Sequence, residues 1–190
     1  DGKVYLIGGQ HNSTTFTART FVYDPAAPAG TRWSEVAAMN APRRYHSAAA
    51  IDGKIYVSGG IGASTAEEPT TVEVYDPGTD TWEVLASGLS IGRGGPASYN
   101  LNGDLVVAAG GWASYLTSSE VYDGAAFSAG PSVNFGLRTV AHDGNDKWLV
   151  KAGGWSGAFI AETEVFAVEA TGCYADCDES GGLDFFDFLC

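Results

Sequence analysis

The sequence predicts an all-β fold of the β-propeller type, built from repeated four-stranded sheets. Two observations carry this prediction. The chain has 26 glycines in 190 residues and is 12% aromatic, which favours turn-rich β-structure over a helical domain. Gly-Gly pairs recur at intervals of 51, 51 and 43 residues, which is a repeat period. The pairs are Gly8 and Gly9, Gly59 and Gly60, Gly110 and Gly111, and Gly153 and Gly154.

Each glycine pair follows a short apolar run, at residues 4–7, 55–57, 105–107 and 148–150, that predicts a buried strand. Three further landmarks recur in a fixed order. They are a tyrosine before an Asp-containing turn, an aromatic residue after that turn, and an arginine before the next glycine pair. The tyrosines are Tyr23, Tyr75 and Tyr122, the later aromatics are Trp33, Trp82 and Phe127, and the arginines are Arg43, Arg93 and Arg138. Four strand signals in a period of about 40 to 50 residues predict one propeller blade per period.

All of these landmarks have a structural role in this interpretation. Glycine at the end of an inner strand permits a positive φ and a close approach of backbone that a Cβ would block. Tyr and Trp on the outer strands supply apolar area between blades, while their OH and NH groups reach polar partners at the edge. The arginines are expected to bond carbonyl or carboxylate oxygens between neighbouring blades.

Two stretches make the resemblance to a family specific. "YDPGTDTW" at 75–82 and "APRRYHSAAAIDGKIYVSGG" at 41–60 closely resemble Kelch repeats, and the resemblance covers residues 1–168. It implies a Kelch-type propeller with three full repeats and part of a fourth. The last unit holds strand signals near Val140, at 148–150 and at 164–168, but lacks an outer strand. Such a segment is expected to leave two open flanks.

The C-terminal stretch predicts a separate calcium-binding unit at 173–190, after a linker at 169–172. Residues 176–187 place oxygen-bearing side chains at positions 1, 3, 5, 9 and 12 of a twelve-residue loop, with glycine at position 6 and a backbone carbonyl at position 7. The expected metal-site residues are Asp176, Asp178, Ser180, Gly182, Asp184 and Asp187. The structureless alternative is an acidic, Gly-rich tail.

This tail, "CYADCDESGGLDFFDFLC", looks like the first repeat of a Cys-containing dockerin-like anchor of secreted bacterial proteins. The resemblance implies Ca²⁺ as a cofactor, a cohesin-like or surface-anchoring partner, and an extracellular or cell-surface location. All three cysteines, Cys173, Cys177 and Cys190, lie here, and their number and spacing favour an interrupted disulfide framework over a zinc site. No cofactor is expected in the propeller.

Function in a propeller usually lies on the loops at one face. Two of these loops carry exposed aromatic candidates for a ligand-binding site, although the same side chains could simply cap the blades. The candidates are Trp112, Tyr115, Trp155 and Phe159. His46, beside Arg43 and Arg44, could suggest a catalytic cluster, but a structural histidine is the favoured interpretation.

The net charge of −13 disfavours nucleic acid and anionic membranes as partners, and no apolar run reaches the roughly 20 residues of a membrane-spanning helix. No catalytic motif is present, and without a cysteine before residue 173 the Tyr-Cys copper chemistry of galactose-oxidase-like enzymes is excluded. The sequence therefore predicts a non-catalytic binding scaffold for protein, with carbohydrate as a further ligand class. The alternative is a carbohydrate-active propeller enzyme whose catalytic residues lie on further blades.

Overall fold

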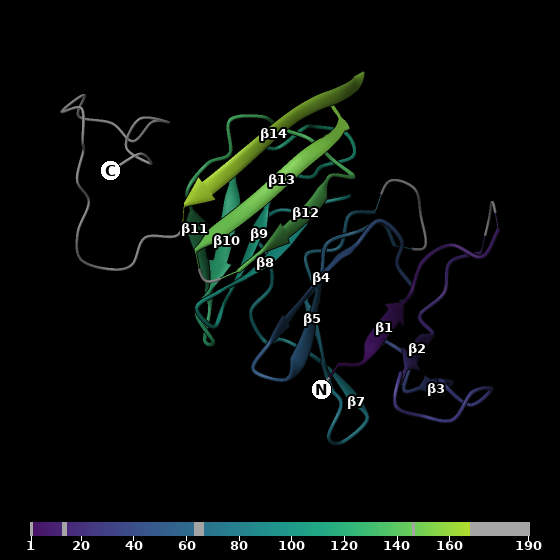
Figure 1. Cartoon of the computed structure of the whole chain (residues 1–190). Helices are drawn as coiled ribbons and strands as arrows, with labels where there is room; N and C mark the ends of the chain where they lie inside the picture. Colours follow the sequence, from purple (N-terminus) through teal and green to yellow (C-terminus); the bar gives the residue numbers. More distant parts are fainter. Residues whose placement is uncertain (1, 13–14, 63–66, 146, 168–190) are drawn as a thin grey trace.

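The computed structural model describes residues 2–12, 15–62, 67–145 and 147–167, and Figure 1 shows them as strands and loops only. The strands are β1 (Val4–Ile7), β2 (Thr20–Tyr23), β3 (Trp33–Val36), β4 (Ser47–Ile51), β5 (Lys54–Ser58), β6 (Glu73–Asp76), β7 (Thr81–Val84), β8 (Ala97–Leu101), β9 (Asp104–Ala108), β10 (Ser119–Tyr122), β11 (Phe127–Gly130), β12 (Ala141–Gly144), β13 (Trp148–Trp155) and β14 (Phe159–Ala167). Among the described residues no helix is long and apolar enough to cross a membrane.

These strands form four separate antiparallel sheets, which follow one another along the chain (Figure 1). Their orders are β1-β2-β3, β4-β5-β6-β7, β8-β9-β10-β11 and β12-β13-β14, so every sheet is a meander. The four runs before the glycine pairs fall in different sheets, as β1, β5, β9 and β13. This confirms the predicted all-β fold of repeated sheets.

Within the described residues, the two shorter sheets each lack a different strand. β1 precedes a glycine pair as β5 and β9 do, so the first sheet corresponds to the second, third and fourth strands of a full sheet. The last sheet has the first three strands and, among the described residues, no outer strand. It therefore has the three strands that its sequence signals predicted.

The predicted outer-strand aromatics lie directly opposite each other across the third and fourth strands. Tyr75 pairs in register with Trp82, and the same relation holds for the first and third sheets. In all three cases the ring centroids are 5.1 Å apart. The recurring spacing of tyrosine and aromatic residue is thus the spacing of one hairpin, with the Asp-containing turn between them.

The hydrophobic core is divided into three layers, one between each pair of neighbouring sheets. Ile55, Val57 and Tyr75 of the second sheet pack on Tyr5 and Ile7 of the first. The second layer joins Ile51 to Leu105 and Val107, and the third joins Tyr99 and Val106 to Leu149. The first strands β4, β8 and β12 contact one another in succession. The second and third sheets therefore each bury one face on the sheet before and one on the sheet after, as propeller blades do.

The glycine pairs lie where the second strand of one sheet meets the chain entering the next. Gly59 has φ +63°, and a Cβ there would lie 2.3 Å from the Arg93 carbonyl oxygen. In the third unit the equivalent pair is Ala109 and Gly110, one residue earlier than predicted, because the Gly110 N–H donates to the next unit as that of Gly60 does. Ala109 adopts the left-handed conformation, with φ +59°.

The predicted linker at 169–172 and calcium unit at 173–190 lie outside the described residues, as do Asp176, Asp178, Ser180, Gly182, Asp184 and Asp187 and the three cysteines. The calcium loop and the disulfide framework stay predictions.

Candidate functional site: an aromatic and arginine-rich loop surface

Two kinds of connection share one face of the molecule because strands in a meander alternate in direction. One kind joins the second strand of a sheet to the third, and the other joins the outer strand to the first strand of the next sheet. The described parts of 8–19, 59–72 and 109–118 belong to the first kind, and 37–46, 85–96 and 131–140 to the second. This face carries the candidate site.

The backbone of this face is pinned near the first strands by a repeated hydrogen bond. The Gly95 N–H donates to the Tyr45 carbonyl, and the Thr139 N–H donates to the Gly95 carbonyl, each over 2.8 Å. All three residues have φ between +52° and +67°. Glycine adopts this backbone conformation easily, whereas a residue with a side chain as large as that of Tyr45 adopts it only where surrounding contacts hold it.

Tyr45 lies flat against Trp112 from the neighbouring unit. Their ring centroids are 5.0 Å apart with an interplanar angle of 25°, and the Tyr45 side chain is 43% exposed. The backbone N–H of Trp112 donates to the Glu68 carboxylate over 3.0 Å, and the backbone N–H of Gly94 donates to the same oxygen over 2.6 Å. Glu68 therefore fixes the loop that presents the indole ring.

Two arginines stack on this aromatic pair from either side. The Arg138 guanidinium carbon lies 3.8 Å from the Trp112 ring centre and 5.6 Å from that of Tyr115. Arg44 lies 5.2 Å from the Tyr45 ring centre and 4.4 Å from that of Phe16. We call the exposed or half-buried residues of this arrangement the aromatic–arginine surface. It consists of Arg44, Tyr45, Trp112, Tyr115 and Arg138.

The structure brings three of the four predicted aromatics to Arg138. Trp112 and Tyr115 contact its guanidinium, and the Trp155 backbone N–H and C=O pair with those of Arg138 over 3.0 and 3.1 Å. Phe159 lies against the Trp155 ring at 4.8 Å and is 89% exposed, so it extends the group outward. Sequence reasoning missed Tyr45 and Arg44; the signal was the motif Arg-Arg-Tyr at 43–45, with a bulky residue where the next unit has Gly95.

Arg43 and Arg93 lie beneath this surface and link neighbouring units. The carbonyl of Arg43 accepts from Gly9 of the first unit, while its guanidinium donates to Gly59 O, Thr71 O and the Glu73 carboxylate of the second. Arg93 repeats this with Gly60, Ala109, Ser118 and Glu120. Both arginine side chains are buried, with exposed fractions of 1% for Arg43 and 0% for Arg93.

Arg138 is not the equivalent of these two arginines. Leu137 occupies the equivalent position, because its carbonyl accepts the Gly110 N–H. Arg138 corresponds to Arg44 and lies on the exposed side of the loop. The buried cation of the fourth sheet is Lys151, which pairs with Glu164 and donates to Phe135 O. Sequence reasoning missed the buried glutamates, whose signal is the recurring Glu-Val-Tyr or Glu-Val-Phe that begins at Glu73, Glu120 and Glu164.

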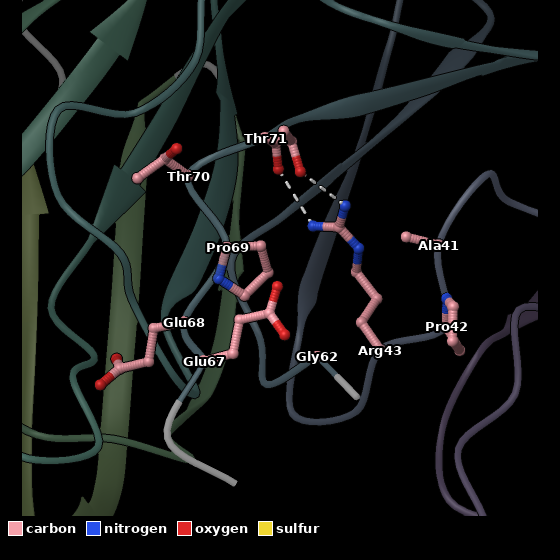
Figure 2. A pocket seen from close by; sticks show the side chains of 9 residues that line it. All are labelled: Ala41, Pro42, Arg43, Gly62, Glu67, Glu68, Pro69, Thr70 and Thr71. Atoms are coloured by element: carbon pink, nitrogen blue, oxygen red, sulfur yellow. Dashed lines mark hydrogen bonds between the residues drawn. The ribbon is translucent and has the colours of Figure 1, made fainter. Parts of the chain in front are cut away.

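A pocket of about 420 Å³ is lined in part by Arg43. Figure 2 shows the Arg43 guanidinium directed at Thr71, with hydrogen bonds of 3.0 Å to its carbonyl and to its hydroxyl. Pro42 and Pro69 form apolar walls, and Glu68 also lines it. The charged groups of Arg43 and Glu68 are thus already engaged in holding loops.

The two histidines of this region, His46 and His142, are half-buried. His46 lies under the Gly8 and Gly60 backbone, and burial, with the nearby Arg43 charge, lowers its pKa to about 4. His142 Nε2 lies 3.0 Å from Ser47 Oγ, and burial lowers its pKa as well. Both are therefore neutral at pH 7. In the described part of the chain, no three His, Cys, Asp or Glu residues gather as a metal site would require.

Comparison with known proteins supports the same architecture. A family model described as "Kelch motif" matches residues 42–88. Kelch-like protein 15 of Danio rerio is 31% identical over 127 residues, covering 58% of this chain and 21% of that protein. Kelch-like protein 23 of Homo sapiens is 34% identical over 87 residues, covering 46% of this chain and 14% of the other. The chain thus spans about a fifth or less of these relatives' length.

A solved structure titled "Structure of YjhT" superposes with a TM-score of 0.66 at 18% identity, covering 87% of this chain and 66% of that one. At this identity the likeness concerns the fold alone. The motif match, the relatives and this structural neighbour agree with the four meander sheets and support a Kelch-repeat β-propeller segment.

Proposed function

We propose that this protein is a non-catalytic binding scaffold that holds a partner protein on the aromatic–arginine surface. One observation carries the proposal: Tyr45 is exposed, yet it is held in a costly backbone conformation and stacked on Trp112 of another unit. Rigid, exposed aromatic and arginine side chains are the groups that dominate binding energy at protein interfaces. Carbohydrate is a further ligand class for the same rings.

The proposal is tested by selecting binders from a random dodecapeptide display library on the full chain. Selected peptides are expected to lose at least about tenfold in affinity for the double variant Tyr45→Gly, Trp112→Ala, since an interface hot spot contributes roughly 2 kcal/mol or more. Trp33→Ala is the matched control, because Trp33 is an exposed tryptophan on β3, away from this surface. Peptides that bind both variants equally would contradict the proposal.

We further propose that the protein is exported to the cell exterior or surface and anchored there through a calcium-dependent, dockerin-like unit at 173–190. The support is the ligand spacing of the sequence, with four carboxylates among the five side-chain ligands. Without a cation these carboxylates repel one another. Calorimetry should detect calcium binding to the chain, and Asp176→Ala with Asp187→Ala should abolish it; heat that survives both substitutions would exclude the loop.

A further inference from the structure

The turn between β8 and β9 lies at the opposite end of the sheets from the aromatic–arginine surface, because it joins a first strand to a second strand. Its two residues are Asn102 and Gly103, and they follow Leu101, which pairs in register with Asp104. Both turn residues are exposed, with φ of +54° for Asn102 and +99° for Gly103. Positive φ at both positions is typical of a type I′ turn, for which Asn-Gly is a favoured pair.

Asn102 is the one asparagine of the sequence that a glycine follows. Glycine has no Cβ to hinder its own backbone nitrogen from approaching the side chain before it. The space beside Gly103 is also open to water, since a Cβ built there would meet no atom within 4 Å. The Asn102 side-chain amide has no hydrogen-bond partner among the described residues. The amide and the backbone nitrogen of Gly103 are therefore two neighbouring groups that can react within one molecule.

We propose that Asn102 is a site of spontaneous deamidation. Hydroxide removes the proton of the Gly103 nitrogen, which then forms a bond to Cγ of Asn102. The bond between Cγ and the amide nitrogen breaks, and that nitrogen takes a proton from water and leaves as ammonia. One water molecule then opens the succinimide ring. Attack of this water at Cγ gives Asp, whereas attack at the main-chain carbonyl gives isoaspartate, whose main chain runs through Cβ and Cγ.

Asn100 restrains this reaction. The Gly103 N–H donates to Asn100 Oδ1 over 3.0 Å, so the proton that must leave is already held by an acceptor. Asn100 Nδ2 in turn donates to the Ala50 carbonyl of β4 over 2.9 Å. The side chain that restrains Gly103 is therefore itself fixed by the packing of β8 on β4 of the second sheet. The rate of deamidation depends on that packing as well as on the turn.

The second sheet shows which product the turn accommodates. The turn between β4 and β5 has Asp52 and Gly53 in the same two places, with φ of +49° and +78°. An Asp at residue 102 therefore fits the turn without a change of backbone. Isoaspartate instead adds a carbon to the main chain of a two-residue loop whose length sets the register of β8 and β9. Only this second product should weaken the hairpin.

Peptide mapping by mass spectrometry, after incubation of the full chain in mildly alkaline buffer, tests the site. Asn102 should be the first asparagine that becomes an acid, and its rate of conversion should rise with the hydroxide concentration. Asn40 and Asn134 are internal controls, because Ala and Phe follow them. Conversion of either control as fast as Asn102 would overturn the proposal.

The chain unfolded in urea at the same pH supplies the reference rate without the turn. The folded chain should convert more slowly than this reference but within about tenfold of it, since one hydrogen bond restrains the Gly103 N–H. An Asn102 that is still wholly amide well beyond that time would also overturn the proposal.

Two variants test the restraint by Asn100. Asn100→Ala removes the acceptor, so Asn102 should deamidate about two- to tenfold faster. Asn100→Asp keeps an acceptor oxygen for the Gly103 N–H and should not accelerate the reaction. Circular dichroism checks that both variants are folded. Equal rates in Asn100→Ala and the unsubstituted chain would refute the restraint.

The two products test the role of the turn. Asn102→Asp reproduces the first product and should unfold at the same urea concentration as the unsubstituted chain. The isoaspartyl form, purified from the incubated protein by chromatography, should unfold at a lower urea concentration. An isoaspartyl form as stable as Asn102→Asp would contradict the expected effect on the hairpin.

Discussion

In the second and third sheets the cation that neutralises a buried glutamate comes from the loop before the first strand, whereas in the fourth sheet it comes from the second strand. Arg43 pairs with Glu73 over 2.9 Å and Arg93 with Glu120 over 3.1 Å, while Lys151 of β13 pairs with Glu164. The glutamate itself has the same task in every case.

That task is to hold the chain arriving from the previous sheet. Glu73 accepts the Asn40 N–H, Glu120 the Ser90 N–H and Glu164 the Asn134 N–H, each over 2.6 Å. The cation compensates the charge of each carboxylate in a buried place, where an unpaired charge would be costly.

The connection between the second and third strands explains the change of cation. In the second and third sheets this connection is long, and the arginine also binds its end, at Thr71 O or Ser118 O. In the fourth sheet β13 and β14 are joined by the short turn 156–158, so no long loop end needs a partner. The short connection between β13 and β14 therefore accompanies the replacement of the arginine by a lysine.

The largest effect is expected from removing an arginine of the longer sheets. Arg43→Met leaves the Glu73 carboxylate buried and uncompensated and frees the Thr71 and Gly59 carbonyls, so the free energy of unfolding should fall by about 3–5 kcal/mol. Urea titration followed by tryptophan fluorescence measures this. Arg19→Met, which breaks the exposed pair with Glu35, should leave stability almost unchanged, because solvent screens this pair. Equal losses in the two variants would refute the distinction.

Lys151→Met should also destabilise, by about 3 kcal/mol, because Glu164 loses its only ion pair among the described residues. The added substitution Leu137→Arg should recover part of this loss, since Leu137 occupies the place that Arg43 and Arg93 hold in their sheets. The same urea titration compares the single and double variants. A double variant less stable than Lys151→Met would show that the sheets are not interchangeable at this position.

The pH dependence of stability should reveal His46, which only the second unit has. Its pKa is about 4 in the folded chain and near 6.5 when unfolded, so below pH 6.5 the unfolded state binds more protons. Stability is therefore present above pH 6.5 and falls as the pH drops toward 4, by about 2 kcal/mol between pH 7 and pH 5. The His46→Gln variant should lose less stability than the unsubstituted chain as the pH falls. The His11→Gln variant, altered at an exposed histidine, should show the same loss as the unsubstituted chain. Unfolding midpoints over that pH range decide.

The smallest effect concerns the repeated left-handed position. Thr139 has φ +53° where the preceding unit has Gly95, and its side chain is exposed. Thr139→Gly should relieve strain at some cost in chain entropy, for a net gain of less than about 1 kcal/mol. Thr139→Ala keeps the left-handed strain and should show no such gain. Thermal unfolding compares the melting temperatures of the two variants, and a Thr139→Gly variant less stable than the unsubstituted chain would contradict the prediction.

The sequence could predict the sheets because their signals are local. The glycine pairs, the Tyr-to-Trp spacing and the apolar runs each describe one strand or one hairpin, and the four sheets follow from their repetition. The one-residue displacement of Ala109 and Gly110 escaped this reading, because a glycine pair does not reveal which of its residues donates to the next unit. Arg138 bonds the Trp112 carbonyl of the preceding unit, as expected of the arginines, but it occupies the place of Arg44 instead of that of Arg43 and Arg93.

The sequence by itself determined the repeat and the all-β fold, and it singled out Trp112, Tyr115, Trp155 and Phe159; it expected the last two in a loop, whereas they end β13 and begin β14. Only the tertiary structure decided that Tyr45 stacks on Trp112, that Arg44 and Arg138 lie beside them on one surface, and that Lys151 replaces an arginine. The contacts that Trp112 makes with Tyr45 and with Arg138 join residues from different units. The geometry of these contacts depends on how neighbouring sheets pack and on which backbone groups pair between them, and the repeat period of the sequence predicts neither.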